Sequence, residues 1–175
     1  MRVFLDANVL YPTVLRGMLL DFAKLGAFNP LWSDRVIEEW RRAAIRNNET
    51  GADIEIALMK SDWPDALVSD QAISGVTLPD DDDVHVIDSA LAGNADEILT
   101  ANTSDFPSKT LTQLGLIRRH PDEFLLELYN AHQNEAGRIF EAARKKAQVK
   151  SGKQIELDGL LKRMRLMRLR KAIRS

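Results

Sequence analysis

Val3-Phe4-Leu5-Asp6-Ala7-Asn8 is the stretch of sequence that decides the fold. Its first three residues form a short apolar run, which favours a buried strand, and Asp6 stands where that strand would end. A helical pattern of apolar residues follows at positions 14–25 and is closed by Gly26. The opening of the chain therefore predicts a buried strand, an acidic residue at its carboxyl end and then a helix.

The same alternation of short apolar runs and amphipathic helices continues along all 175 residues. Further strands are expected at 30–32, 76–78, 97–100 and 115–117, and further helices at 33–44, 54–60, 83–93 and after Pro121. Strands that alternate with helices are typical of an α/β fold, in which helices flank a central and mostly parallel sheet.

The composition excludes several classes of chemistry. The sequence has no cysteine, so disulfides, thiolate metal sites and cysteine nucleophiles are excluded, and a reducing compartment is expected. No segment has the pattern of a signal peptide or of a membrane span. Hydrophobic residues at 45% and charged residues at 29% are ordinary for a soluble globular protein. We therefore expect a cytoplasmic protein without a membrane partner.

The net charge of −2 conceals an uneven distribution. Residues 144–174 contain 12 Lys and Arg against two acids, a local charge of +10, whereas the rest of the chain carries −12. Apolar residues recur at helical spacing between Leu157 and Met167, which predicts a basic amphipathic helix. Its apolar side could pack on the acidic body or on a second subunit of a homodimer. Electrostatic contact with RNA phosphates is the next alternative, and a membrane surface is disfavoured because Trp and Phe are lacking.

Acidic and amide side chains stand at the predicted carboxyl ends of the strands. They are Asp6 and Asn8 after the first, Glu38 and Glu39 after the second, Asp80, Asp81, Asp82 and Asp83 after the third, and Asn102 and Asp105 after the fourth. In parallel sheets these ends meet at one edge, where such folds bind ligands. Converging carboxylates repel one another unless a cation lies between them, and oxygen ligands favour Mg²⁺ or Mn²⁺. The pattern predicts a metal site that can activate water and hold a phosphodiester.

Each of these residues also has a purely structural interpretation. Aspartate after a strand is a common turn residue, and the run of four aspartates is typical of a solvated loop that caps a helix. Glu39 flanks the buried side of its helix more closely than Glu38 does, so Glu39 is the better candidate. His85 is a candidate ligand or general base, although its apolar neighbours favour a histidine packed on a helix.

Four motifs of the chain form an ordered set. They are Phe4-Leu5-Asp6-Ala7-Asn8-Val9-Leu10, Trp32-Ser33 with Glu39, Leu78-Pro79-Asp80 through Asp83 to Leu91, and Ala95-Asp96 through Thr100 and Asn102 to Asp105-Phe106-Pro107. This set resembles the PIN-domain family of metal-dependent ribonucleases, many of which are VapC-like toxins of bacterial toxin–antitoxin pairs. The resemblance implies a PIN-like, three-layer nuclease domain at residues 1–126 and leaves a helical, basic C-terminal extension at residues 127–175.

The resemblance also implies the ligands of the metal site, which are Asp6, Glu39 and Asp83. The family usually has an aspartate two residues after the threonine, where this chain has Asn102. The fourth position therefore falls to Asn102 or to Asp105, and Asp105 is a further catalytic candidate. Asn8 is expected to orient Asp6 rather than to bind the metal. The implied activity is Mg²⁺- or Mn²⁺-dependent hydrolysis of RNA by an endoribonuclease, with an antitoxin as a protein partner.

Two other functions remain open. The first is a degenerate PIN-like module, weakened at Asn102, that binds RNA or a protein without cleaving; calorimetry with Mn²⁺ would distinguish it, because such a module need not hold metal. The second is an aspartyl-phosphate phosphohydrolase, which also places an acid after its first strand and a threonine after a later one. The sequence disfavours this class, because Asn8 stands where its second acid is expected. An acyl-phosphate trapped on Asp6 would support the phosphohydrolase.

Overall fold

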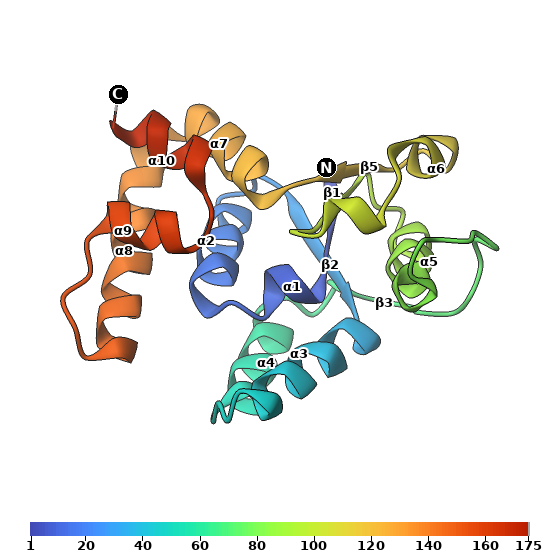
Figure 1. Ribbon diagram of the computed structural model, residues 1–175, viewed down its shortest axis with the longest axis horizontal. Helices are drawn as coiled ribbons and strands as arrows, with labels where there is room; N and C mark the ends of the chain where they lie inside the picture. Colours follow the sequence, from blue (N-terminus) through green and yellow to red (C-terminus); the bar gives the residue numbers. More distant parts are fainter. Residues whose placement is uncertain (175) are drawn as a thin grey trace.

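The computed structural model describes residues 1–174 and has a five-stranded sheet at its centre (Figure 1). The strands are β1 (Arg2–Leu5), β2 (Asn29–Ser33), β3 (Leu67–Val68), β4 (Glu97–Leu99) and β5 (Ile117–Arg119). Their order across the sheet is β3-β2-β1-β4-β5, and every pairing is parallel. The prediction of a mostly parallel α/β sheet is therefore confirmed.

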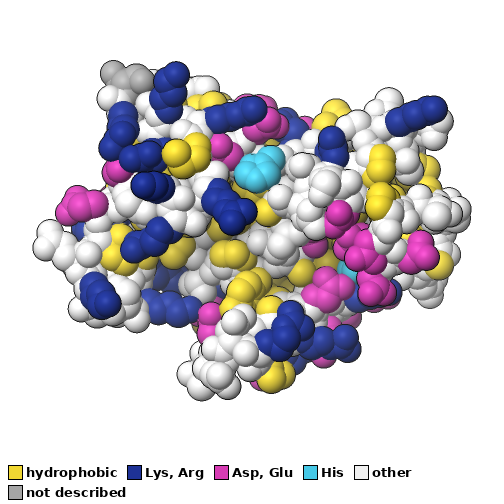
Figure 2. Space-filling view, viewed as in Figure 1, with side chains coloured by type: hydrophobic (Ala, Val, Ile, Leu, Met, Phe, Trp, Pro, Cys, Tyr) yellow, Lys and Arg dark blue, Asp and Glu magenta, His cyan; other side chains and the backbone are white. Residues whose placement is uncertain are grey.

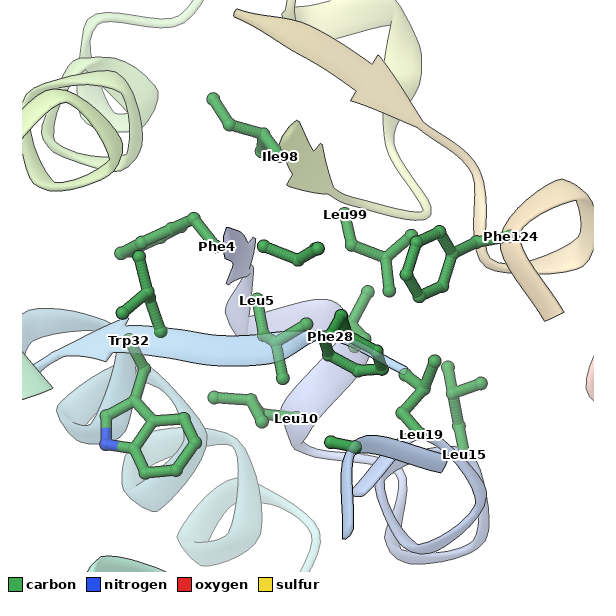
Figure 3. Close-up of a cluster of buried hydrophobic side chains, with 14 of the residues drawn as sticks. Phe4, Leu5, Leu10, Leu15, Leu19, Phe28, Trp32, Ile98, Leu99 and Phe124 are labelled. Atoms are coloured by element: carbon green, nitrogen blue, oxygen red, sulfur yellow. The ribbon is translucent and has the colours of Figure 1, made fainter. Parts of the chain in front are cut away.

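The first strand is central because its apolar residues are buried on both faces. Phe4 pairs in register with Leu31 of β2 and with Ile98 of β4, and all three side chains are buried. Figure 3 shows Phe4 and Ile98 among buried apolar side chains that include Leu10, Leu19 and Phe124 from the surrounding helices. Parallel strands need such cover on both faces, which explains why the opening run is uninterruptedly apolar.

Helices cover both faces of the sheet. They are α1 (Ala7–Leu10), α2 (Thr13–Lys24), α3 (Asp34–Arg46), α4 (Ala52–Asp62), α5 (Val84–Ala92), α6 (Ser108–Gln113), α7 (Pro121–Ala131), α8 (Gln133–Ser151), α9 (Leu157–Arg163) and α10 (Met167–Arg174), with short 3₁₀ turns η1 (Asp81–Asp83) and η2 (Thr103–Asp105). In Figure 1, α5 lies on one side of the sheet, and α1 and α2 lie on the other. The arrangement is the three-layer one that was expected.

The predicted strand at 76–78 is wrong. The third strand is the two-residue β3, paired with Trp32 and Ser33, and residues 69–80 form an irregular connection. Leu78 is buried in the core but does not belong to a strand, so its apolar side chain reflects burial alone. The connection is held by Asp88 of α5, whose Oδ1 accepts the backbone N–H of Ile73 at 3.1 Å and of Ser74 at 2.7 Å.

The buried Arg16 of α2 connects three helices. Its guanidinium donates to the backbone oxygens of Leu10 and Tyr11 at the end of α1, and it forms an ion pair with Glu55 of α4. The same group lies 4.1 Å from the centre of the Trp40 ring of α3. Arg16 therefore satisfies the carbonyls at the end of α1 and fixes that end against α3 and α4.

The basic segment predicted as one amphipathic helix consists of two, α9 and α10. The break lies at Arg165, which has a φ of 59°, and the buried Leu166 follows it. Leu161 and Leu169 belong to the same hydrophobic core as Phe22 of α2, so the extension packs on the body of the molecule. The proposed boundary at residue 126 falls inside α7 and stays a prediction. Within residues 1–174, no helix is long and apolar enough to cross a membrane.

Candidate active site

Asp6 lies at the carboxyl edge of the sheet, where β1 passes directly into α1. It is the N-cap of α1, and its Oδ1 accepts the N–H of Ala7 at 2.6 Å. Its Oδ2 accepts hydrogen bonds from Asn8 Nδ2 at 2.5 Å and from the Thr100 hydroxyl at 2.7 Å. The side chain is only 5% exposed, and burial raises the pKa of its carboxyl group although these three hydrogen bonds act in the opposite direction. Asp6 is thus held in one orientation by its neighbours.

Thr100 is brought to Asp6 by the register of the sheet. Leu5 pairs with Leu99, so the residues that follow these two strands are neighbours. The Thr100 hydroxyl donates to Asp6 and accepts from Asn8 Nδ2 and from the N–H of Asn102, both at 3.1 Å. Sequence reasoning placed Thr100 at a strand end but gave it no role. The signal that could have found it is the adjacency of the first and fourth strands.

The side chains predicted from four separate segments line one open cleft of about 350 Å³. Its polar lining contains Asp6, Asn8, Glu39, Asp83 and Asn102, and the remaining lining residues are Ala7, Tyr11, Trp40, Ala43, Arg46 and Phe106. In Figure 2, acidic side chains gather on this face of the molecule near α5 and the start of α3. The edge of the sheet therefore does bring the predicted acids together.

Glu39 and Glu38 have different surroundings, as their helical positions suggested. The Glu39 carboxylate lines the cleft, and its Oε1 lies 2.8 Å from Nε2 of His85. This is a close polar contact, not an aligned hydrogen bond. Glu38 instead pairs with Arg41 at 2.7 Å and Arg42 at 3.1 Å on the flank of α3. His85 is a buried helix histidine, as favoured, and its ring also supports the Glu39 side of the cleft.

Asp83 carries the clearest electrostatic signature in the cleft. Burial raises the pKa of its carboxyl group to about 6, and the negative charges of Asp6, Asp105 and Asp80 act in the same direction. Carboxylates that share a site in this way disfavour ionisation of one another. A bound cation would relieve this repulsion, so the raised pKa is consistent with a functional site.

The fourth position is divided between two residues. Asn102 lines the cleft, whereas Asp105 lies behind it and its Oδ2 accepts a hydrogen bond from Asn102 Nδ2. The Asn102 Oδ1 accepts from the Ser104 hydroxyl at 3.0 Å. Asp105 also raises the pKa of Asp83 through a side-chain hydrogen bond, so it contributes negative charge from the second layer of the site.

The donor chemistry of the cleft fits a hard divalent cation, because carboxylate and amide oxygens are its preferred ligands. Within residues 1–174, however, no group of three Asp, Glu or His side chains already stands close enough to hold a metal ion. The carboxylates of Asp6, Glu39 and Asp83 nonetheless line the same cleft. Binding of a cation would therefore draw the carboxylates inward by side-chain movement.

Tyr11 and Arg46 are cleft residues that sequence reasoning missed. Arg46 is exposed in the last turn of α3, and its guanidinium has no ion pair or hydrogen bond within the described chain. It lies seven residues after Glu39, which is the spacing of two turns on one helix face, and this spacing was the available signal. The Tyr11 hydroxyl donates to Glu49 and accepts from Asn47 Nδ2, both at 2.9 Å. The cleft thus has an acidic end and a cationic, aromatic end.

Comparison with known proteins agrees with this geometry. A family model described as the PIN domain matches residues 2–104, which is more than half of the chain. No curated protein and no solved structure matches it. PIN domains are generally nucleases, and they typically use divalent metals and bind nucleic acid. The matched segment contains the parallel strands β1 to β4 and all the acids that line the cleft, and the chain therefore belongs to the PIN-domain family.

Proposed function

We propose that this chain is a metal-dependent endoribonuclease that hydrolyses RNA phosphodiesters with Mg²⁺ or Mn²⁺. One observation carries the proposal: Asp6, Glu39 and Asp83, from three separate elements, line a single cleft. Membership of a family of nucleases supports the reaction class, and the carboxylate and amide oxygens of the lining support the choice of metal.

Asp6, Glu39 and Asp83 would hold the cation. When bound, it would activate water and neutralise charge on the phosphodiester during in-line displacement. The hydrogen bonds from Thr100 and Asn8 keep the Asp6 carboxylate in a fixed orientation, so that little reorganisation is needed at that ligand. The Asp83 carboxyl, whose pKa burial and nearby carboxylates raise to about 6, would be stabilised in its ionised form by the cation.

Asn102 would complete the site with an amide oxygen in place of the usual carboxylate. This exchange removes one negative charge from the ligand set, so the cation would be held less tightly. Asp105 partly compensates from behind, because it bonds to Asn102 and adds negative charge near Asp83. We propose Asp105 as an electrostatic support of the site rather than as a direct ligand.

The proposed biological role is that of the toxin in a toxin–antitoxin pair, acting in the cytoplasm and inhibited by an antitoxin protein. This role rests on analogy with PIN-domain toxins alone. It requires that expression of the chain arrests bacterial growth, and that the product of a neighbouring gene relieves the arrest. Growth that continues during expression of a cleavage-competent protein would contradict the toxin role and leave the nuclease activity in place.

The nuclease proposal is tested with Asp6→Asn. This change keeps the shape of the side chain and removes its charge, so metal-dependent cleavage of a single-stranded RNA should be lost. The matched control is Asp62→Asn at the exposed end of α4, which should cleave normally. Circular dichroism should show that both variants are folded. Equal cleavage by the wild-type protein in EDTA and in Mg²⁺ would overturn the mechanism.

A non-catalytic PIN-like module is the second candidate, and one observation favours it. No three acidic or histidine side chains within residues 1–174 are already arranged around a metal position, and Asn102 occupies the fourth corner. Calorimetry with Mn²⁺ separates the two functions. Binding in the wild type that is lost in Asp6→Asn supports the nuclease, whereas no binding in either supports the module.

A further inference from the structure

The acidic cleft continues into a second hollow that leads to the C-terminal extension. Tyr11 lines both spaces. The second hollow, of about 210 Å³, is bordered by apolar side chains of α1, α2 and α9, together with Glu49 and Lys150, whose side chains form an ion pair at 3.6 Å. Its far wall is formed by Leu160 and Met164. One continuous surface therefore connects the site of the acids with the end of α9.

Cations without partners gather at the end of that surface. Lys162, Arg163 and Arg165 flank Met164, are exposed, and form no side-chain ion pair or hydrogen bond within the described chain. We call these three residues the basic turn. Several other cations of the extension are occupied: Arg144 pairs with Glu141, and Arg170 pairs with Asp158. Figure 2 shows Lys and Arg gathered over α9 and α10 on the same face as the acidic side chains.

The acidic cleft cannot itself attract a polyanion. Its lining carries the three carboxylates of Asp6, Glu39 and Asp83 against the single guanidinium of Arg46. Affinity for a nucleic acid comes mainly from neutralisation of phosphates by Lys and Arg. Two sets of unpaired cations adjoin this surface: Arg46 lines the cleft, and the basic turn flanks Met164, which lines the second hollow.

From this arrangement we infer that the extension binds the substrate strand. A single-stranded RNA would place its scissile phosphate in the acidic cleft, pass Arg46 and Tyr11, and reach the basic turn with the phosphates that follow. The ring of Tyr11 is held in place through its hydroxyl and offers a stacking surface for one base. This inference rests on the proposed nuclease function, and it assigns to the extension a part in substrate binding that lies outside the segment matched by the family model.

The test compares two pairs of charge removals in the Asp6→Asn protein, which should bind RNA without cleaving it. Lys162→Gln/Arg163→Gln removes two cations of the basic turn. Arg2→Gln/Arg138→Gln removes two exposed arginines whose guanidinium groups also lack partners in the described chain, one at the opposite edge of the sheet and one in the early part of α8. Fluorescence anisotropy with a labelled 12-nucleotide RNA is recorded over a range of salt concentrations.

Loss of two phosphate contacts should reduce the slope of log affinity against log salt by about 1.4 in the basic-turn variant, because each contact to a single strand contributes about 0.7. The control pair should keep the slope of the parent protein. Tyr11→Leu should weaken binding at every salt concentration with little change of slope, since stacking is not an ionic interaction. Melting curves confirm that each variant is folded.

Several results would overturn the inference without touching the nuclease proposal. One is an equal slope for the basic-turn variant and the control pair while cleavage by the parent chain persists. Another is a basic-turn variant that loses binding to anionic lipid vesicles while its RNA binding is unchanged, which would assign the basic turn to a membrane surface. In cleaving protein, the basic-turn change should raise KM for a long RNA and leave kcat unchanged. Failure of the nuclease proposal would instead appear as absent cleavage in the wild type.

Discussion

The acidic cleft and the C-terminal extension both concentrate charge, but they use it differently. In the cleft, burial raises the pKa of the Asp6 and Asp83 carboxyl groups, and nearby carboxylates act in the same direction. In the extension, Arg170 and Arg174 lie on Asp158, while the apolar sides of α9 and α10 are buried. Carboxylates gather at the proposed site, whereas the paired charges of the extension stabilise the packing of its helices. The basic turn resembles the cleft in this respect, because its cations have no partners within residues 1–174.

The anchor of the extension illustrates how architecture uses charge. Asp122 of α7 is 6% exposed, and its carboxylate accepts the backbone N–H groups of Arg168 and Leu169 at 2.9 to 3.1 Å. These groups lie in the first turn of α10, where N–H donors have no partner inside the helix. A buried carboxylate thereby caps a helix that follows it by more than 40 residues.

The largest expected effect separates the two neighbouring glutamates of α3. Glu39→Gln should reduce metal-dependent RNA cleavage by at least about 100-fold, because it removes a charge that faces the cation position. Glu38→Gln should change the rate little, since Glu38 is occupied by Arg41 and Arg42 outside the cleft. Single-turnover cleavage assays measure both. Equal losses in the two variants would remove the distinction between the glutamate of α3 that lines the cleft and the one that lies outside it.

The next effect concerns the anchor of the extension. Asp122→Ala should lower the free energy of unfolding by about 1–2 kcal/mol, because it leaves buried N–H groups of α10 without an acceptor. Glu123→Ala is the control: Glu123 pairs with Arg168 on the surface, and its loss should cost no more than about 0.5 kcal/mol. Urea unfolding of both variants gives the comparison. If Asp122→Ala lowered the free energy of unfolding no more than Glu123→Ala does, α10 would not depend on this cap.

A third prediction adds charge to the cleft. Asn102→Asp should raise the affinity for Mn²⁺ about tenfold, because affinity for hard cations increases with the number of charged ligands. Calorimetry at constant pH measures the change. As a control, Asn94→Asp places the same new charge after α5, on a residue that does not line the cleft, and should leave Mn²⁺ affinity unchanged. An unchanged affinity in Asn102→Asp would show that this corner takes no part in binding.

The smallest effect follows from the pKa of Asp83. Folding raises this pKa from 3.8 to about 6. Between these two pH values the folded state therefore keeps a proton on Asp83 that the unfolded state has lost. Stability of the metal-free protein should therefore fall as the pH rises from about 4 to about 6. Since Asp83 is only partly buried, the loss should be about 1 kcal/mol after screening by solvent. Urea unfolding in EDTA at pH 4.5 and 7.5 should show this loss of stability in the wild type, and the loss should be smaller in Asp83→Asn.

Several features of the fold and site could be predicted from the sequence because they depend on local patterns. The apolar run at 3–5 predicts the central strand, and the polar residues after each strand predict the edge at which they gather. The two-residue β3 could not be found, because its pairing with Trp32 and Ser33 depends on tertiary context and its length gives no period. The left-handed Arg165, which divides the predicted C-terminal helix, has no glycine or proline signal.

The roles of individual side chains were less accessible than the segments that carry them. Asp105 is adjacent to the site in sequence, but only the conformation of η2 places it behind Asn102 instead of in the cleft. Arg46 was missed although it shares a helix face with Glu39, because a charged residue at a helix end is ordinarily a solvated one. Ligand-like residue types can be read from the sequence, whereas their orientation depends on packing.

The contacts of Arg16 imply that the two walls of the cleft differ in their dynamics. One wall, formed by α1 and α3, is joined by a buried cation that bonds to the end of α1 and stacks on Trp40. The opposite wall carries Asp83 and follows the irregular connection at 69–80, which is held mainly by Asp88. Local opening is cheapest where buried contacts are few. Amide hydrogen exchange should therefore be slow in α1 and α3 and faster over 69–83, so that the Asp83 wall adapts to what binds while the Asp6 wall stays fixed.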